Sequence, residues 1–268
     1  MIRASQVLFN NCPVEDQVVN NSGAFPYAYT IPEITANVNS SGVAASVTLT
    51  SSPPFIPGVV ANFPINTAQV LPYTATAPGE DNAICSFTLY VYDTGVPTYP
   101  SCPENPLIFN TSNSDQATAT WDTPIPTDNS ADDISESMQT FPDETSGAMF
   151  PIGDSMLTYS ATDGSGNTGY CYITIRVLDT GDPVVYSYPE NMTANTDFGQ
   201  PTAVVNWTAP NATDNSGIVL FSYETNGTSF NSPSYNFPIG LSEVAVTVAD
   251  PSGNNVTGEF YITVQGIL

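Results

Sequence analysis

The sequence predicts an all-β protein made of three tandem sandwich domains. The stretch FPIN at 63–66 returns as FPIG at 150–153 and again at 237–240, a spacing of 87 residues each time. Repetition at a fixed period indicates repeated structural units. Runs such as CSFTLYVY and CYITIRVL carry an apolar residue at every second position, as half-buried strands do. Clusters of Pro, Gly, Asn and Ser interrupt these runs, which predicts short strands joined by turns.

The repeats place domain boundaries near residues 95 and 182, which gives domains at 1–95, 96–182 and 183–268. Trp121 and Trp207 occupy equivalent positions in the second and third domains, and Tyr29 takes that position in the first. Domains of this size with about seven short strands are typical of an immunoglobulin-like sandwich. Three of them in a row predict an extended rod.

Cysteine usage predicts two disulfides and an oxidising compartment, because the count is even and no CxxC motif is present. In an immunoglobulin-like topology, the first strand and the start of the last strand lie at the same end of the sandwich. The pairs that this topology predicts are Cys12–Cys85 and Cys102–Cys171. The third domain has Tyr188 and Phe260 at these two places, and we expect an aromatic contact there instead.

The charge balance excludes several classes of partner. The chain has 26 acidic residues, no Lys, no His and two basic residues, Arg3 and Arg176, for a net charge of -24. Such a surface repels the phosphates of nucleic acids and anionic membranes. It attracts divalent cations and keeps separate copies apart at low salt. No run approaches 18 apolar residues, so membrane insertion is not expected.

The absence of His and Lys also limits the catalytic chemistry. Ser-His and Cys-His nucleophile pairs are excluded, and only carboxylate mechanisms remain, namely glycoside hydrolysis and aspartic proteolysis. The motif Asp-Thr-Gly, found at 93–95 and 179–181, is typical of aspartic proteases. Here each copy ends a predicted last strand and precedes a proline by two residues, so we interpret it as a linker turn. We predict that the chain is not an enzyme.

Acidic residues are predicted to gather where consecutive domains meet. DGSGN at 163–167 and DPSGN at 250–254 resemble the start of an EF-hand loop, but they lack its later Gly and closing Glu, so we expect hairpin turns. These hairpins and the TDN turns share one end of a sandwich with the incoming linker. The candidate calcium ligands are Asp93, Asp128 and Asp163 at the first junction, and Asp179, Asp182, Asp214 and Asp250 at the second. The alternative is that these carboxylates are solvated, with Asp128 and Asp214 capping their own turns.

The second domain resembles a known family. CPENP is followed by ATATWDTPIPTDNS, then by FPIG and by ATDGSGNTGYC, and this order is similar to that of a hyalin repeat, or HYR module. The match is strong over 100–182 and good over 183–268 apart from the lost cysteines. It is weak over 1–95, where TDNS and DGSGN have both changed. The resemblance implies an extracellular immunoglobulin-like module used in adhesion and matrix assembly, without enzymatic activity.

Eight Asn-x-Ser/Thr sequons predict N-linked glycans at several positions if a eukaryote makes the chain. They begin at Asn20, Asn39, Asn110, Asn191, Asn206, Asn211, Asn226 and Asn255. No cofactor is required by this interpretation, and calcium is the candidate ion.

The sequence therefore favours an extracellular or cell-surface structural protein that assembles with copies of itself, as the subunit of a head-to-tail filament or matrix. The third domain ends in VQGIL without an Asp-Thr-Gly link, and a head-to-tail contact between copies would propagate as a fibre. The segment SQVLFN could add to a neighbour's sheet edge. The alternative is a monomeric adhesin or receptor rod that binds a glycan or protein through exposed tyrosines. A carboxylate-based glycosidase is a third and weaker interpretation.

Overall fold

The computed structural model describes residues 6–23, 26–51, 54–130, 134–140 and 145–267. The elements of regular structure in these residues are all β-strands. Among the same residues, no helix is long and apolar enough to cross a membrane. Contacts between Cα atoms divide the chain into two compact units. The first comprises Met1–Cys102, Pro124–Gln139 and Thr158–Cys171; the second comprises Pro103–Thr123, Thr140–Leu157 and Tyr172–Leu268.

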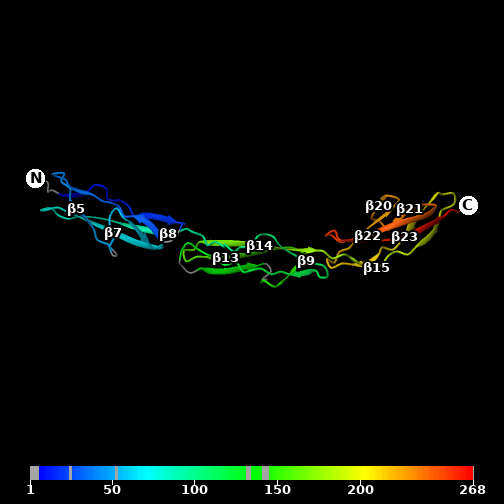
Figure 1. The fold of residues 1–268 in the computed structure, drawn as a ribbon. Coiled ribbons are helices and arrows are strands. Elements are labelled where there is room, and N and C mark those ends of the chain that lie inside the picture. The colour runs from blue at the N-terminus through cyan, green and yellow to red at the C-terminus, as the bar shows by residue number, and fades with distance from the viewer. Residues whose placement is uncertain (1–5, 24–25, 52–53, 131–133, 141–144, 268) are drawn as a thin grey trace. The chain divides into compact units, whose positions relative to one another are not determined.

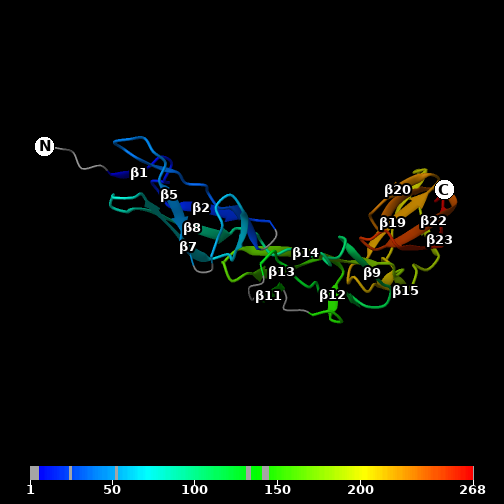
Figure 2. The same ribbon diagram turned by 60° about the vertical axis from the view of Figure 1, so that its left-hand side comes forward.

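The first third of the chain forms eight strands, coloured blue to cyan in Figure 1. They are β1 (Val7–Phe9), β2 (Gln17–Asn21), β3 (Tyr27–Thr30), β4 (Ala36–Val38), β5 (Ser46–Leu49), β6 (Val60–Phe63), β7 (Thr67–Thr76) and β8 (Ala83–Asp93). The main sheet has the order β2-β8-β7-β5, and two smaller sheets pair β1 with β4 and β3 with β6. Figure 2 shows β7 and β8 side by side along their length.

The described residues of the middle third form six strands. They are β9 (Leu107–Thr111), β10 (Gln116–Thr118), β11 (Ser135–Thr140), β12 (Met149–Pro151), β13 (Gly153–Thr162) and β14 (Thr168–Asp179). The main sheet has the order β11-β13-β14-β9, and β10 pairs with β12. Because β13 and β14 continue from one compact unit into the other, the middle repeat contributes to both units.

The last third forms nine strands. They are β15 (Val184–Ser187), β16 (Met192–Asn195), β17 (Thr202–Asn206), β18 (Asn211–Thr213), β19 (Leu220–Thr225), β20 (Thr228–Phe230), β21 (Ser234–Pro238), β22 (Gly240–Ala249) and β23 (Asn255–Gln265). The main sheet has the order β16-β23-β22-β19-β20, and smaller sheets pair β15 with β18 and β17 with β21.

The three repeats share one topology. In each, an early strand pairs in parallel with the last strand: β2 with β8, β9 with β14, and β16 with β23. The final residue of each last strand lies opposite the end of the early strand, and these final residues are Asp93, Asp179 and Gln265. Small sheets and a four- or five-stranded main sheet, joined in this order, form an immunoglobulin-like sandwich.

Aromatic side chains fill the cores. Phe63, Phe150 and Phe237, from the three Phe-Pro-Ile steps, are 0–1% exposed. Trp121 packs against Phe150, and Trp207 lies 5.2 Å from Tyr223 between ring centroids. The large apolar area that these rings remove from water is the main stabilising contribution in each core.

Both cysteine pairs form disulfides, Cys12–Cys85 with a Cα–Cα distance of 6.0 Å and Cys102–Cys171 with 5.8 Å. In the third repeat the structure corrects the expected replacement. Cys85 lies opposite Tyr73, the seventh residue of β7, and Gly258 lies opposite Val246, the seventh residue of β22. Gly258, rather than Phe260, therefore takes the place of the second cysteine.

The ring of Tyr188 occupies the space that the disulfide takes in the other repeats. A Cβ atom on Gly258 would lie within 2.8 Å of three atoms of the Tyr188 ring. Tyr188 is packed against the core cluster that contains Phe260. The glycine is thus required because a ring fills the adjoining volume, and the tyrosine and glycine replace the bridge as a pair.

In the segment SQVLFN, Ser5 lies outside the described residues, and Val7–Phe9 form β1, which pairs antiparallel with β4 of the same chain in a two-stranded sheet. Addition of this segment to a neighbour's sheet edge stays a prediction. Val7 is buried in a cluster with Ala36, Val38 and Ala75.

We expect the double substitution Tyr188→Cys and Gly258→Cys to form a third disulfide, because the backbone at these positions matches the two bridged repeats. A loop of about 70 residues contributes roughly 2–4 kcal/mol in the chain-entropy model, less the lost packing of the tyrosine. Mass spectrometry and thiol titration after oxidative refolding would measure it. Tyr188→Cys alone, with its one free thiol, is the matched control, and two reactive thiols in the double variant would contradict the assignment.

Candidate metal centres

The first compact unit brings three predicted aspartates together. Asp93 is the last residue of β8, Asp128 follows Thr127, and Asp163 follows the end of β13. One carboxylate oxygen from each lies within 4.8 Å of the other two. The turns hold them in place: Thr127 bridges to Thr98, and Asp163 begins the tight hairpin between β13 and β14.

The second compact unit contains the same arrangement. Asp179 ends β14, Asp214 follows β18, and Asp250 follows β22, and these three carboxylates also lie within 4.8 Å of one another. Asp182 does not belong to this cluster. It is exposed and lies beyond Gly181, whose N–H donates to the carboxylate of Asp179. The structure therefore does not place Asp182 with the other three candidate ligands.

Asp93 and Asp128 accept local hydrogen bonds through one oxygen each, whereas Asp163 accepts them through both oxygens. Oδ1 of Asp93 accepts bonds from the Gly95 N–H at 2.9 Å and the Asn129 amide at 3.1 Å. Oδ1 of Asp128 accepts bonds from the N–H and hydroxyl of Ser130. Asp163 accepts bonds from the Asn167 N–H and side-chain amide, both at 2.8 Å. These bonds orient the carboxylates inward.

The second cluster repeats these bonds. Oδ1 of Asp179 accepts bonds from the Gly181 N–H at 3.0 Å and the Asn215 amide at 2.8 Å. Oδ1 of Asp214 accepts bonds from Ser216, and Asp250 accepts bonds from Asn254 at 2.9 and 2.7 Å. The same geometry thus occurs in both compact units, with the same residue types at equivalent positions of the repeat.

Four carboxylate oxygens in the two clusters are buried without a partner. They are Oδ2 of Asp93, Asp128, Asp179 and Asp214. The Asp93 and Asp179 side chains are only 5% and 7% exposed. An ionised carboxylate oxygen taken out of water without a donor costs several kcal/mol, so such groups are normally paired or coordinate a metal.

Two opposing effects act on the pKa of Asp250. Burial has the largest single effect and raises its pKa. The hydrogen bonds from the Asn254 side chain and from the N–H groups of Asn254, Gly253 and Ser252 together outweigh burial, so the pKa lies below 3.8. The fold therefore favours the ionised form of this ligand.

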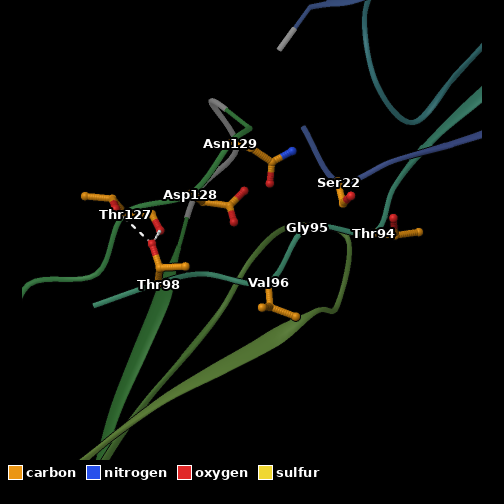
Figure 3. Close-up of a pocket in the computed structure, with 8 residues that line it drawn as sticks. All are labelled: Ser22, Thr94, Gly95, Val96, Thr98, Thr127, Asp128 and Asn129. Carbon is orange, nitrogen blue, oxygen red and sulfur yellow. Dashed lines mark hydrogen bonds between the residues drawn. The ribbon is translucent and has the colours of Figure 1, made fainter. Parts of the chain in front are cut away.

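The donor set suits a calcium ion. Ca²⁺ takes six to eight oxygen ligands at about 2.3–2.6 Å, so oxygens around one ion lie up to about 5 Å apart. An open hollow of about 500 Å³ borders the first cluster and is lined by Asp128, Asn129 and the 94–98 linker (Figure 3). Waters that enter through it would complete the coordination shell.

Protein cations do not neutralise the clusters in the part of the chain that the structure describes. Arg3 lies outside the described residues. Arg176 donates two hydrogen bonds of 2.7 Å to the carboxylate of Asp154, an exposed pair outside both clusters. Among the described residues, no Arg side chain is therefore paired with a carboxylate of either cluster.

The Asp-Thr-Gly motif has a structural explanation. Its glycine N–H binds the carboxylate of its own aspartate, and a Cβ on Gly95 or Gly181 would overlap the amide of Asn129 or Asn215. Each motif aspartate has the aspartates of the next repeat as its neighbours. The two motifs thus belong to two separate clusters, whereas in an aspartic protease their carboxylates share one proton.

Sequence reasoning missed the asparagines that organise the clusters. Asn129 and Asn215 donate to the strand-end aspartates, while Asn167 and Asn254 donate to the hairpin aspartates. Asn167 and Asn254 also donate to the backbone carbonyls of Asp93 and Asp179, both at 3.2 Å. Their signal was present, because TDN and SGN recur at the same places in the second and third repeats.

All eight sequon asparagines are exposed, which leaves each position accessible to a glycan. They are Asn20, Asn39, Asn110, Asn191, Asn206, Asn211, Asn226 and Asn255. Asn206 points outward while the neighbouring Trp207 is buried, as the alternation along β17 requires.

Curated proteins provide relatives for much of the chain. A mouse protein, Sushi, von Willebrand factor type A, EGF and pentraxin domain-containing protein 1, is 34% identical over 171 residues, which are 62% of this chain and 4% of that protein. Hyalin of Strongylocentrotus purpuratus is 32% identical over 211 residues, which are 76% of this chain and 16% of hyalin. The chain thus spans a small part of the length of these relatives.

Solved structures with several domains align along nearly the whole chain. A titin fragment, the E-to-A variant of domains I67–I69, covers 98% of this chain and 99% of its own, with 10% identity and a TM-score of 0.36. Drosophila N-cadherin EC1–3 covers 94% of this chain and 98% of its own, with 12% identity and a TM-score of 0.34.

A family model described as HYR domain matches residues 92–177 and 178–264. These two matches contain both Asp-Thr-Gly motifs and all six clustered aspartates. Since they cover more than half of the sequence, the chain belongs to the HYR-domain family.

Proposed function

We propose that the chain is an extracellular structural and adhesive protein whose consecutive repeats are held together by calcium. The observation that carries this proposal is the pair of matched aspartate clusters, each with two buried carboxylate oxygens that lack a partner. Membership of the HYR family, the two disulfides and the exposed sequons support an extracellular or cell-surface location.

The clusters connect consecutive repeats within each compact unit. In the first unit, Asp93 ends a strand of the first repeat, whereas Asp128 and Asp163 belong to loops of the second. An ion bound to all three would fix the orientation of the strand end relative to these loops. Without the ion, the repulsion between three carboxylates would favour their separation. Calcium would therefore act on the stiffness of the connection, and the chain would have no enzymatic activity.

Self-association is the second part of the proposal: we infer that the chain is a subunit of a head-to-tail filament or matrix. Calcium supports such an assembly in two ways, since it stiffens each copy and lowers the net charge of -24 that keeps copies apart. Negative-stain images in calcium and in chelator would test it, and isolated molecules under both conditions would contradict it.

A monomeric adhesin is the second candidate, and exposed tyrosines on β8 and β14 favour it. The rings of Tyr90 and Tyr92 stack with 6.3 Å between centroids, and Tyr92, Tyr170 and Tyr172 are about half exposed. Aromatic faces of this kind bind sugars and peptides. Binding of a glycan by a chain that stays monomeric would favour this alternative over the filament.

We expect the chain to bind two calcium ions with dissociation constants of about 10⁻⁴–10⁻³ M, the range of extracellular modules. Isothermal titration calorimetry would measure the stoichiometry. Asp128→Asn keeps the oxygen that accepts from Ser130 but removes one charge, and it should reduce the number of ions to one. Asp214→Asn should do the same independently. The exposed Asp122→Asn is the matched control and should still bind two ions.

Calcium should reverse the order of stability of the wild type and these variants. In chelator, Asp214→Asn should be as stable as the wild type or more stable, because it relieves repulsion within the cluster. At ten times the dissociation constant, each intact site adds about 1.4 kcal/mol to the free energy of unfolding. The wild type should then be the more stable protein by thermal unfolding. Equal stabilisation of wild type and variant by calcium would contradict binding at this cluster.

Stability in chelator should depend on the charge of Asp250. The pKa of Asp250 is lowered in the folded protein. Its ionised form therefore contributes its full share to stability at pH values above the pKa in the unfolded state, and this contribution is lost as the pH falls through the pKa in the folded state. We expect Asp250→Asn to flatten the dependence of the melting temperature on pH in the acidic range, where a carboxyl group with a lowered pKa becomes protonated. Asp122→Asn is again the control, and an unchanged pH profile in Asp250→Asn would count against the assigned role.

A further inference from the structure

The third repeat ends in an exposed face with apolar side chains. We define the third-repeat end face as Phe198, Ile239, Gln265 and Ile267. Backbone bonds bring these segments together: the Thr196 N–H donates to the Gln265 carbonyl at 2.9 Å, and the Ile239 N–H donates to the Pro201 carbonyl at 3.2 Å. Phe198 is 80% exposed, Ile239 52% and Ile267 47%.

Two positions differ between the third repeat and the earlier ones. Ile65, in the first Phe-Pro-Ile step, is 7% exposed and Ile152 in the second is half-buried, whereas Ile239 in the third step is 52% exposed. The strand-end residues Asp93 and Asp179 are buried, whereas Gly266, which follows Val264 as Asp93 follows Val91 by two residues, is exposed. The third-repeat end face therefore corresponds to the surface at which an earlier repeat meets the next one, and it is exposed in the part of the chain that the structure describes.

The opposite end of the first repeat has lost the ligands that its loops carry in the later repeats. Leu8 and Thr98 each precede a disulfide cysteine by four residues, and Leu8 pairs with Asn37 as Thr98 pairs with Thr127. Val38, the residue after Asn37, therefore takes the place of Asp128.

The hairpin position has changed in the same way. Ala77 follows the end of β7, as Asp163 follows β13 and Asp250 follows β22. Val38 and Ala77 pack in one apolar cluster with Val7 and Ala36. We define the first-repeat end face as Leu8, Val38, Val43 and Ala77, of which Leu8 is 51% and Val43 62% exposed.

We propose that the third-repeat end face of one copy docks onto the first-repeat end face of a second copy. This proposal rests on the self-association in the proposed function and names its surfaces. The reason is that the replacements match across the two faces. Both internal clusters combine one strand-end aspartate with two loop aspartates, and a junction between copies would combine Gly266, which takes the place of the strand-end aspartate, with Val38 and Ala77. Every carboxylate of the cluster is replaced, on both sides, by a neutral group.

This contact would depend on apolar burial instead of calcium. A face with Val38 and Ala77 offers no side-chain ligand to an ion, and Gly266 on the other side carries no charge. A retained aspartate on one side alone would be buried unpaired. Glu80 and Asp81 on the hairpin, and Asp197 beside Phe198, place acidic residues close to both faces. We therefore expect association to strengthen with salt, which screens these charges.

The experiment is sedimentation velocity over a wide range of protein concentration, with chelator and with calcium. We expect reversible, concentration-dependent association of the wild type in both conditions, because the end of one sandwich is a small surface and its affinity is micromolar to millimolar. Leu8→Ser should weaken association about tenfold or more, and so should Phe198→Ser with Ile239→Ser. Ile108→Ser, equally exposed on β9, is the matched control and should associate like the wild type.

Mixing the variants tests the polarity of the contact. A copy with Leu8→Ser keeps its third-repeat end face, and a copy with Phe198→Ser and Ile239→Ser keeps its first-repeat end face. Each alone should stay monomeric, whereas their mixture should form dimers and nothing longer. Dimers of the Leu8→Ser variant alone would overturn the head-to-tail contact in favour of a symmetric one.

Two further outcomes separate this inference from the proposed function. Association that is unchanged by the end-face substitutions would overturn the assigned surfaces and leave self-assembly in place. A wild type that stays monomeric at every concentration and salt condition would overturn both, and the end faces would then be covered by another domain or protein. Circular dichroism of each variant would verify that it folds, and calcium binding is a separate measurement that these outcomes do not affect.

Discussion

Three like charges held within 4.8 Å of one another are the constraint on which the connections between these repeats depend. A cluster of this kind is stable only with a cation or a proton among its members, because the desolvation of each carboxylate adds to their mutual repulsion. The surrounding residues hold the carboxylates in place and do not neutralise them. Glycine N–H groups, serine hydroxyls and asparagine amides each take one oxygen and leave others directed inward.

The chain has very few basic residues that could neutralise these clusters. With no Lys, no His and two Arg, the protein has almost no cation of its own to place in a cluster, and Arg176 is engaged by Asp154. This is why the proposed function relies on a cation from the medium. Extracellular calcium is abundant enough for weak sites, so an acidic chain with two such clusters would have mechanical properties that depend on the medium around it.

Much of this architecture was predictable because it repeats. The periodicity placed the domains, the cysteine pairs and six clustered aspartates at equivalent positions, and the structure contains both disulfides and both clusters. The failures are local. Gly258 and Phe260 lie on the same side of β23, two residues apart, so alternation of side chains could not decide which of them replaces a cysteine. Asp182 lies beyond the turn at Gly181, where one step along the backbone moves a side chain from the cluster to solvent. The pairing of Val7–Phe9 with β4 was not predicted, because only the tertiary fold brings these two short strands together.

The unequal distribution of disulfides has a consequence for a chain under tension. In the first two repeats, the bridges join residues 73 and 69 positions apart, one early and one late in the sequence of each repeat. Even after unfolding, the segment inside such a loop cannot lengthen the chain, which withholds roughly 240 Å of extension per repeat. The third repeat has a tyrosine ring over a glycine instead of a covalent bond, so it can extend along its whole length. Under a force that unfolded all three repeats, the first two would add little length to the chain. The third repeat would contribute most of the extension.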